Sequence, residues 1–139
     1  VIYSSRANSA IALNWKIKLN ETGKIPAFWN VFPELNHNEM TGFDAANETR
    51  SLSDLFYFIF LKDGEDHPRI IKRMELTEHL YKDRGLLVES IVLDENDIFR
   101  KVFASLLLAD WTAFYTAEGY GVEPERVPMV EEFKKQMTQ

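Results

Sequence analysis

The sequence contains no cysteine among its 139 residues, which excludes disulfide scaffolds, thiol catalysis and Cys-ligated zinc or iron–sulfur centres. Its longest unbroken apolar run, Leu55 to Leu61, has seven residues, whereas a membrane-spanning helix needs roughly 20. Basic residues are in the minority: 16 Lys and Arg stand against 22 Asp and Glu, for a formal charge of −6. We therefore expect no nucleic-acid surface and no anionic-membrane surface, although a small basic pocket is compatible with this balance.

Sequence motifs for metals, nucleotides and acyl transfer are missing as well. The histidines form neither a His-Glu-x-x-His pattern nor a pair three to five residues apart, so we expect no metal site. The six glycines form no phosphate-binding loop, and no Gly-x-Ser-x-Gly nucleophile elbow is present. The printed residues also lack the basic start and apolar stretch of a signal peptide.

Strand and helix signals alternate along the chain. Apolar, strand-forming runs lie at 1–3, 27–31, 55–61 and 86–93, and helical periodicity lies at 6–20, 68–84, 97–117 and 127–137. Residues 32–40 favour a turn or short helix, and residues 41–54 favour an exposed loop. This alternation predicts an α/β fold: a three-layer αβα sandwich with a central parallel sheet, built from right-handed crossovers.

The segment 97–117, which Asp94 to Asn96 would cap, is apolar nearly all round and includes Trp111 and Phe114. Two interpretations stay open at this point. Either it is a core helix that is buried on every side, or it presents a dimer or interdomain surface. The bare start at Val1, inside a strand signal, indicates a piece of a longer protein.

In parallel α/β folds, ligands bind beyond the carboxyl ends of the strands. We therefore expect chemistry in the loops at 4–6, 31–40, 62–68 and 94–96. The acidic stretch from Asp63 to Asp66 lacks an Asp-x-Asp spacing, and we interpret it as a solvated strand-end loop. Glu21 and His37 lie sixteen residues apart, and we expect both at one loop-rich end of the domain. A carboxylate and an imidazole suit proton transfer near pH 7.

The string Pro-Ala-Phe-Trp-Asn-Val-Phe-Pro-Glu-Leu-Asn-His-Asn-Glu at 26–39 resembles the hallmark stretch of bifunctional phosphoglucose/phosphomannose isomerases. Those enzymes are pairs of sugar-isomerase (SIS) domains, and the similarity is to the second, C-terminal domain. Weaker similarity covers the rest of the chain, at 1–5, 15–16, 19–21, 65–70 and 130–134. The resemblance implies that residues 1–139 are a single C-terminal SIS domain of a longer enzyme with two SIS domains.

The resemblance also implies roles for individual residues. Glu21 matches the general base that moves a proton between C1 and C2 of the open-chain sugar through a cis-enediol. His37 matches the histidine that opens the sugar ring and comes from the neighbouring subunit. Lys134 matches the lysine beside the ring oxygen and hydroxyls, with Lys135 as its alternative. Asn20 and Asn36 are the expected substrate-binding residues, adjacent to the base and the histidine.

Two alternatives to these roles stay open: His67 for ring opening and Glu39 for the base, whereas His79 is expected on a helix surface. The resemblance further implies a cytoplasmic enzyme that needs no metal or organic cofactor. Its small-molecule substrates would be glucose-6-phosphate or mannose-6-phosphate and fructose-6-phosphate, and a homodimer would carry the active site at its interface.

One departure from the family limits these expectations. The serine- and threonine-rich loops that grip the sugar phosphate belong mostly to the first SIS domain, and nothing in 1–139 corresponds to them. We therefore expect the isolated domain to be inactive or nearly so. The alternative function is that of a non-catalytic SIS module that binds sugar phosphates in a regulatory protein.

Overall fold

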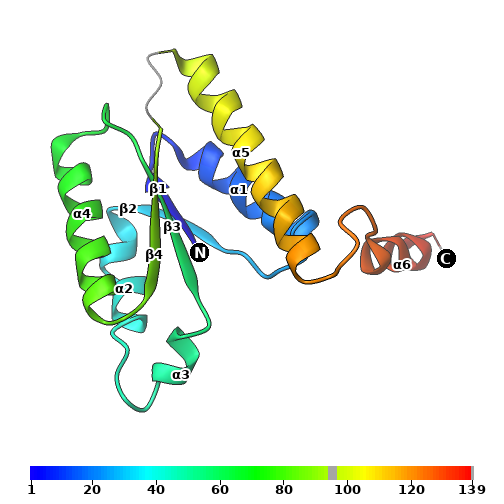
Figure 1. Cartoon of the computed structure of the whole chain (residues 1–139), viewed down its shortest axis with the longest axis horizontal. Coiled ribbons are helices and arrows are strands. Elements are labelled where there is room, and N and C mark those ends of the chain that lie inside the picture. The colour runs from blue at the N-terminus through cyan, green and yellow to red at the C-terminus, as the bar shows by residue number, and fades with distance from the viewer. Residues whose placement is uncertain (94–96, 139) are drawn as a thin grey trace.

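In the computed structural model, which describes residues 1–93 and 97–138, four short strands form one parallel sheet. They are β1 (Ile2–Ser5), β2 (Trp29–Phe32), β3 (Tyr57–Lys62) and β4 (Leu87–Val92), in the order β2-β1-β3-β4. Every neighbouring pair is parallel, so each connection must cross over a face of the sheet (Figure 1). The central parallel sheet predicted from the alternation is confirmed.

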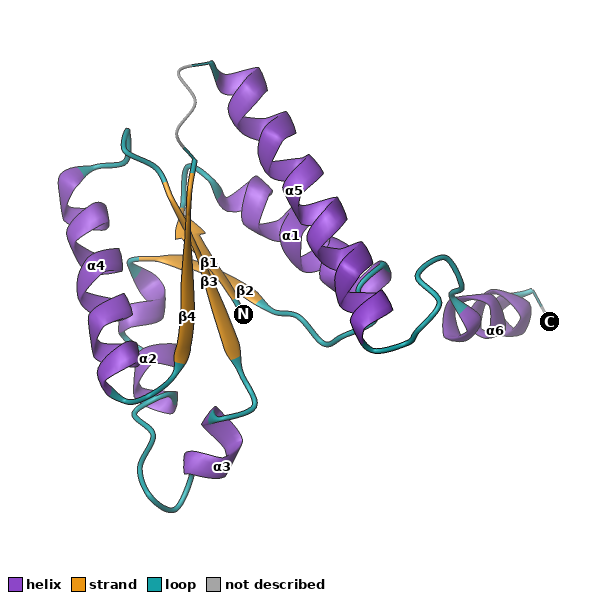
Figure 2. Cartoon of the chain, viewed as in Figure 1, coloured by secondary structure: helices purple, strands orange, loops and turns teal. Residues whose placement is uncertain are grey.

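Helices cover both faces of the sheet (Figure 2). One face carries α1 (Ser9–Glu21) and α5 (Ile98–Gly119); the other carries α4 (Pro68–Asp83), the 3₁₀ turn η1 (Glu34–Asn36) and α2 (Glu39–Gly42). The short helix α3 (Arg50–Ser53) lies before β3, and α6 (Pro128–Met137) follows α5. The predicted three-layer αβα sandwich is therefore confirmed.

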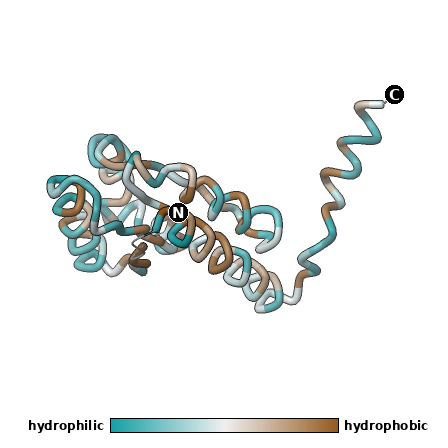
Figure 3. Tube along the Cα trace, turned by 90° about the horizontal axis from the view of Figure 1, so that it is seen from above, coloured by the Kyte–Doolittle hydropathy of each residue, from teal (hydrophilic) through white to brown (hydrophobic). Residues whose placement is uncertain are grey.

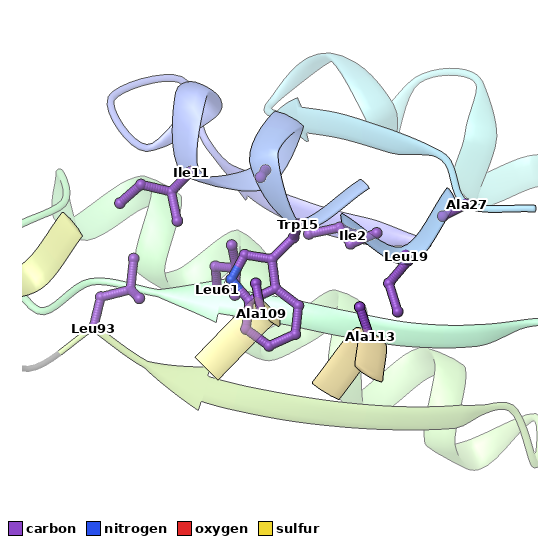
Figure 4. Packing of buried hydrophobic residues seen from close by; sticks show 10 residues of the cluster. Ile2, Ile11, Trp15, Leu19, Ala27, Leu61, Leu93, Ala109 and Ala113 are labelled. Atoms are coloured by element: carbon purple, nitrogen blue, oxygen red, sulfur yellow. The ribbon is translucent and has the colours of Figure 1, made fainter. Parts of the chain in front are cut away.

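The core under α1 and α5 is centred on Trp15, which is 1% exposed (Figure 4). Its indole Nε1 donates a hydrogen bond to Ser105 Oγ at 2.9 Å, which satisfies the one polar group that the ring buries. Ala109 and Ala113 are fully buried beside it. Small side chains let α5 approach α1 closely, so α5 contacts the domain through a narrow alanine and serine face.

The core on the opposite face is aromatic. Tyr3 from β1, Phe58 and Phe60 from β3, and Tyr81 from α4 are all buried, and their ring centroids lie 4.8 to 6.5 Å apart. Burial raises the pKa of Tyr81 to about 12. Burial, together with the neighbouring Tyr81 and Glu39, also raises the pKa of Tyr3. Both phenols therefore stay protonated and can donate hydrogen bonds at neutral pH.

Several local expectations need correction. Helix α1 begins at Ser9 rather than near Arg6, because Ser5 Oγ accepts a hydrogen bond from the Asn8 backbone N–H and closes a turn first. The expected loop 41–54 contains α3 and the end of α2. Capping of the long helix by Asp94 to Asn96 lies outside the described residues; Asp97 caps α5, and its side chain accepts a hydrogen bond from the Arg100 backbone N–H at 3.0 Å.

The two interpretations of segment 97–117 are now distinguished. The outer face of α5 is exposed in this chain, so a core helix buried on every side is wrong. We call this face the α5 apolar face; its large side chains are 46% to 69% exposed and comprise Phe99, Phe103, Leu107, Leu108, Trp111 and Tyr115. A contiguous exposed patch of this kind is typical of a surface that another polypeptide covers.

Candidate functional site

The turn that follows β2 is anchored through Asn36, the last residue of η1. The Asn36 side-chain N–H donates to Thr77 Oγ1 of α4 at 2.9 Å, and its oxygen accepts from Arg73 at 3.3 Å. The amide therefore ties the turn to α4. Both polar groups of the Asn36 side chain already have protein partners. Its substrate-binding role stays a prediction.

The next anchors lie two and three residues further on. Asn38 accepts a hydrogen bond from the Glu39 backbone N–H at 2.6 Å and so caps α2. Glu39 itself is half-buried, and its two carboxylate oxygens accept from the Tyr3 hydroxyl at 2.8 Å and from the Asn30 side chain. The turn is thus fixed to α4 on one side and to the sheet on the other.

His37 stands between these anchors. Its side chain is exposed, and it makes no hydrogen bond or ion pair with any residue that the structure describes. Asn36, Asn38 and Glu39 therefore use their side chains to shape the turn, whereas the exposed imidazole of His37 has no partner for either ring nitrogen among the described residues. An exposed, unpaired imidazole on a fixed backbone suits a proton donor or acceptor for an outside ligand.

Glu21 ends helix α1 and is exposed. The adjacent Asn20 accepts a hydrogen bond from the Ala27 backbone N–H through Oδ1 at 2.7 Å, which holds the start of the β2 segment against the end of α1. The Nδ2 group of Asn20 has no hydrogen-bond partner within the described part of the chain. It remains available to a ligand beside Glu21.

The expectation that Glu21 and His37 share one end of the domain is wrong. Glu21 lies where β2 is about to begin, on the α1 face of the sheet, and His37 lies after β2 has ended, on the α4 face (Figure 1). The physical reason is the crossover, because a helix returns antiparallel to its strand and the next strand carries the chain back. The fifteen residues between them, which include a whole strand, therefore separate the two groups.

Lys134 lies on α6, which projects away from the sandwich (Figure 3). The segment before α6 is tied to the end of α1, since Lys24 Nζ donates to the Arg126 carbonyl at 2.6 Å. Helix α6 thus begins on the same side of the domain as Glu21. The Lys134 ammonium itself pairs with Glu131 at 3.0 Å within the helix, and Lys135 follows it on the exposed surface.

A buried charged cluster lies where the chain leaves β1 and β3. Lys101 of α5 is 5% exposed, and its Nζ lies 2.9 Å from both Asp63 and Glu65. Asn8 donates to the same Asp63 oxygen at 3.0 Å. Burial alone would raise the pKa of Asp63, but hydrogen bonds from Lys101, the Glu65 backbone and Asn8 outweigh it, and the pKa is lowered.

This cluster corrects the interpretation of residues 63–66 as a solvated loop at Asp63, which is only 7% exposed, whereas Gly64 and Glu65 are exposed as expected. The strand order changes direction between β1 and β3, which is where open α/β sheets bind ligands, and here the chain's own Lys101 and Asp63 lie at that position. Sequence reasoning missed Lys101; the available signal was a single lysine on the alanine and serine face of an apolar helix.

The remaining histidines have local partners. His67 Nδ1 accepts from the Arg69 backbone N–H at 3.1 Å and caps α4. His79 lies on the exposed surface of α4 beside Asp83, at 3.3 Å, as expected for a helix-surface residue. Within residues 1–93 and 97–138, no group of three or more His, Asp or Glu is arranged to hold a metal ion.

A cavity of about 890 Å³ lies between the sheet and helices α1 and α5. Its walls are mostly apolar and include Trp15, Leu19, Phe28, Ile59 and Leu108, and none of the predicted site residues lines it. Such a lining does not match a sugar phosphate, which needs converging polar groups. None of the helices in the described ranges combines the length and apolar character of a membrane span.

Comparison with known proteins identifies the family. The model of the bacterial phospho-glucose isomerase C-terminal SIS domain matches residues 1–137. The chain belongs to this SIS-domain family. Similar proteins include the bifunctional phosphoglucose/phosphomannose isomerases of Aquifex aeolicus (30% identical over 99% of the chain), Caldicellulosiruptor bescii (33% over 100%) and Thermoplasma volcanium (33% over 99%).

The SIS domain spans 40% to 42% of the length of these relatives. Among solved structures, a glucose-6-phosphate isomerase-like protein from Thermus thermophilus superposes with a TM-score of 0.62 at 16% identity. That match covers 92% of this chain and 42% of the other, and it shows that the two share a fold. The family expected from the string at 26–39 is confirmed.

Proposed function

We propose that this SIS domain is the C-terminal half of a two-domain isomerase that interconverts glucose-6-phosphate or mannose-6-phosphate with fructose-6-phosphate. One observation supports the proposal most: in the family-like string, Asn36, Asn38 and Glu39 hold the turn, and His37 is left exposed and unpaired. The family match over residues 1–137 supports isomerisation of a sugar phosphate as the reaction class.

The proposed roles follow the order of the reaction. His37 gives a proton to the ring oxygen as the bond from C1 to that oxygen breaks, and the C1 hydroxyl loses its proton to leave the aldehyde. Glu21 then takes the proton from C2 while O1 gains a proton, which gives the cis-enediol. Glu21 returns its proton to C1 as the O2 hydroxyl loses one, so that aldose becomes ketose with no net change in protons or electrons. Lys134 stabilises the oxygen on which negative charge develops.

The geometry supports a site shared between two chains. Glu21 and His37 lie at opposite ends of β2 and on opposite faces of the sheet, so one chain cannot bring both to one sugar. A second copy can supply the missing group if the two copies pair in an isologous dimer. The α5 apolar face offers exposed aromatic and aliphatic surface of the kind that such an interface buries.

We also propose that residues 1–139 by themselves do not isomerise sugar phosphates. The relatives are more than twice as long as this domain, and among the described residues Lys101 is paired with Asp63 at 2.9 Å and so is not free to bind a phosphate. The full-length protein would be a cytoplasmic enzyme that uses no metal or organic cofactor. A coupled assay in which the 139-residue chain reaches the rate of the full-length protein would contradict this.

The test uses two inactive variants of the full-length protein. Glu21→Gln and His37→Ala should each lower kcat about 10²- to 10⁴-fold, as expected for loss of a general acid or base. If the site is shared, mixing and re-associating the two variants in equal amounts restores about a quarter of wild-type activity. That fraction follows because half of the dimers are mixed and each mixed dimer holds one intact site.

The outcomes separate the alternatives. Failure to complement, with both variants inactive, contradicts the shared site but not the catalytic roles. Full activity of Glu21→Gln with unchanged substrate binding contradicts the role of Glu21. Binding of sugar phosphate without any isomerisation by the wild-type protein would instead support the regulatory SIS module.

A further inference from the structure

Glu39 joins three segments of the chain at one carboxylate. It begins α2, two residues after His37, and its Oε2 accepts a hydrogen bond from the Tyr3 hydroxyl at 2.8 Å. Its Oε1 accepts from the side chain of Asn30. Tyr3 and Asn30 are register partners on the neighbouring strands β1 and β2. A single side chain thus fixes the turn to a defined point on the sheet.

The two donors on the sheet, the Tyr3 hydroxyl and the Asn30 amide, need a hydrogen-bond acceptor. Tyr3 is fully buried, and a buried hydroxyl without a hydrogen-bond partner is unfavourable. The Glu39 carboxylate, which accepts the hydrogen bond from Tyr3, is therefore held firmly in place. Burial, the nearby Tyr81 and Glu39 together raise the pKa of Tyr3, which keeps the phenol a donor. The Asn30 amide supplies the second donor, and a carboxylate can accept from both at once.

Resting on the function proposed above for His37, we propose that Glu39 is a positioning residue that holds His37 at the place where it opens the sugar ring. The backbone of His37 is fixed on its other side by Asn36, through Thr77 and Arg73 of α4. Release of the Glu39 contacts frees the C-terminal side of the turn, and the imidazole then loses its defined position although its own chemistry is unchanged.

This role differs from the alternative in which Glu39 is itself the base. A base needs a carboxylate oxygen that faces the substrate, and both oxygens of Glu39 are already engaged by Tyr3 and Asn30. The difference is testable because a positioning residue needs only its hydrogen bonds, whereas a base needs its charge.

Two substitutions in the full-length protein separate hydrogen bonding from charge. Glu39→Met removes both acceptors while keeping a long unbranched side chain. Glu39→Gln removes the charge but keeps a hydrogen bond to each neighbour. Its amide oxygen can accept from Asn30, and its amide N–H can donate to the Tyr3 oxygen once the Tyr3 O–H turns to the neighbouring Tyr81 oxygen, which has no other hydrogen-bond partner among the described residues. We expect Glu39→Met to lower kcat about 10- to 100-fold, as misplacement of a catalytic group by about 1 Å does. Glu39→Gln should retain more than half of the activity.

The measurements are kcat and KM for isomerisation, and the rate of exchange between the α and β anomers of glucose-6-phosphate by NMR. Anomer exchange requires ring opening and closing but no proton transfer between C1 and C2. Glu39→Met should lower both rates by the same factor and leave KM unchanged. Tyr3→Phe removes one of the two bonds without a change in ring packing, and should give a smaller loss of the same kind.

Glu34→Met is the matched control, since Glu34 lies in the same turn but is exposed, and within the described residues its side chain accepts a single hydrogen bond, from Asn38 at 3.5 Å. It should leave both rates unchanged. All variants are compared at a temperature at which their circular dichroism spectra match that of the wild type. A loss in Glu39→Met that disappears under this condition, or that appears in KM alone, would indicate a purely structural role and overturn the proposal.

Other outcomes overturn the inference in distinguishable ways. If Glu39→Gln is as inactive as Glu39→Met, the charge is required and positioning by hydrogen bonds is wrong. If His37→Ala abolishes anomer exchange but Glu39→Met does not, the positioning role alone is wrong. If His37→Ala leaves anomer exchange at the wild-type rate, the role proposed for His37 fails first and the inference fails with it.

Discussion

Replacement of Lys101 by methionine tests the buried ion pair that joins α5 to the end of β3. The Lys101 side chain is 5% exposed and that of Asp63 is 8% exposed, with 2.9 Å between the charged atoms. Methionine keeps most of the length and apolar volume of the lysine stem, so the substitution removes a charge rather than creating a large cavity. Asp63 then remains buried without its counter-charge.

The expected cost can be worked from these contacts. Removal of one partner from a buried ion pair destabilises a protein by about 3–5 kcal/mol. Asp63 would retain hydrogen bonds from Asn8 and from the Glu65 backbone, each at 3.0 Å, and the second arm of the pair, Glu65, is 77% exposed and contributes little. We therefore expect a loss near the lower limit, about 3 kcal/mol, and a Tm lower by about 12 °C.

The effect should depend on pH in one direction. The pKa of Asp63 is lowered in the folded chain by its hydrogen bonds to Lys101, Glu65 and Asn8, against the opposing effect of burial. A lowered carboxyl pKa contributes stability above the unfolded value of about 3.9 and loses it as the pH falls through the folded value. The difference between wild type and Lys101→Met should be constant from about pH 7 to 5 and shrink below about pH 4.

The assay is urea unfolding of the 139-residue chain, monitored by circular dichroism and by the fluorescence of its three tryptophans. Lys72→Met is the control, because Lys72 is 67% exposed and lies 3.7 Å from Glu75; it should change the free energy of unfolding by less than about 0.5 kcal/mol. A loss below about 1 kcal/mol for Lys101→Met, or an equal loss in the control, would refute the reasoning.

Two further predictions concern the other side of the sheet. Hydrogen bonds from Lys62 and Lys82 outweigh burial and lower the pKa of Glu78 to about 2, so Glu78→Gln should destabilise the chain by about 1–2 kcal/mol at pH 7. Urea unfolding at pH 7, 4 and 2.5 should show that difference shrink as the pH falls from about 4.5 towards 2, and a difference that does not change with pH would contradict the assignment. Gly85 has φ +76° after α4, so Gly85→Ala should lower stability by about 1–2 kcal/mol. Gly119→Ala, with open space around the added Cβ, should not lower the Tm, and equal effects of the two would be inconsistent with backbone strain.

The positions of the main elements follow from local chemistry, which the sequence displays directly. Apolar spacing and terminal signals located α4 within one residue, with Pro68 at its start and Gly85 just beyond its end. The string at 26–39 also predicted the family, which the family model over residues 1–137 confirms. These features depend on neighbours within a few positions, and a single sequence contains those neighbours.

Features that depend on distant segments required the tertiary structure. The sequence by itself determined the α/β alternation, the family and the candidate residues Glu21 and His37. Only the fold decided that these two lie at opposite ends of β2, that Lys101 on α5 neutralises Asp63 after β3, and that Glu39 bridges Tyr3 and Asn30. The reason is physical: crossover connections and strand register bring together side chains that are 9 to 38 positions apart, and local patterns do not encode such distances.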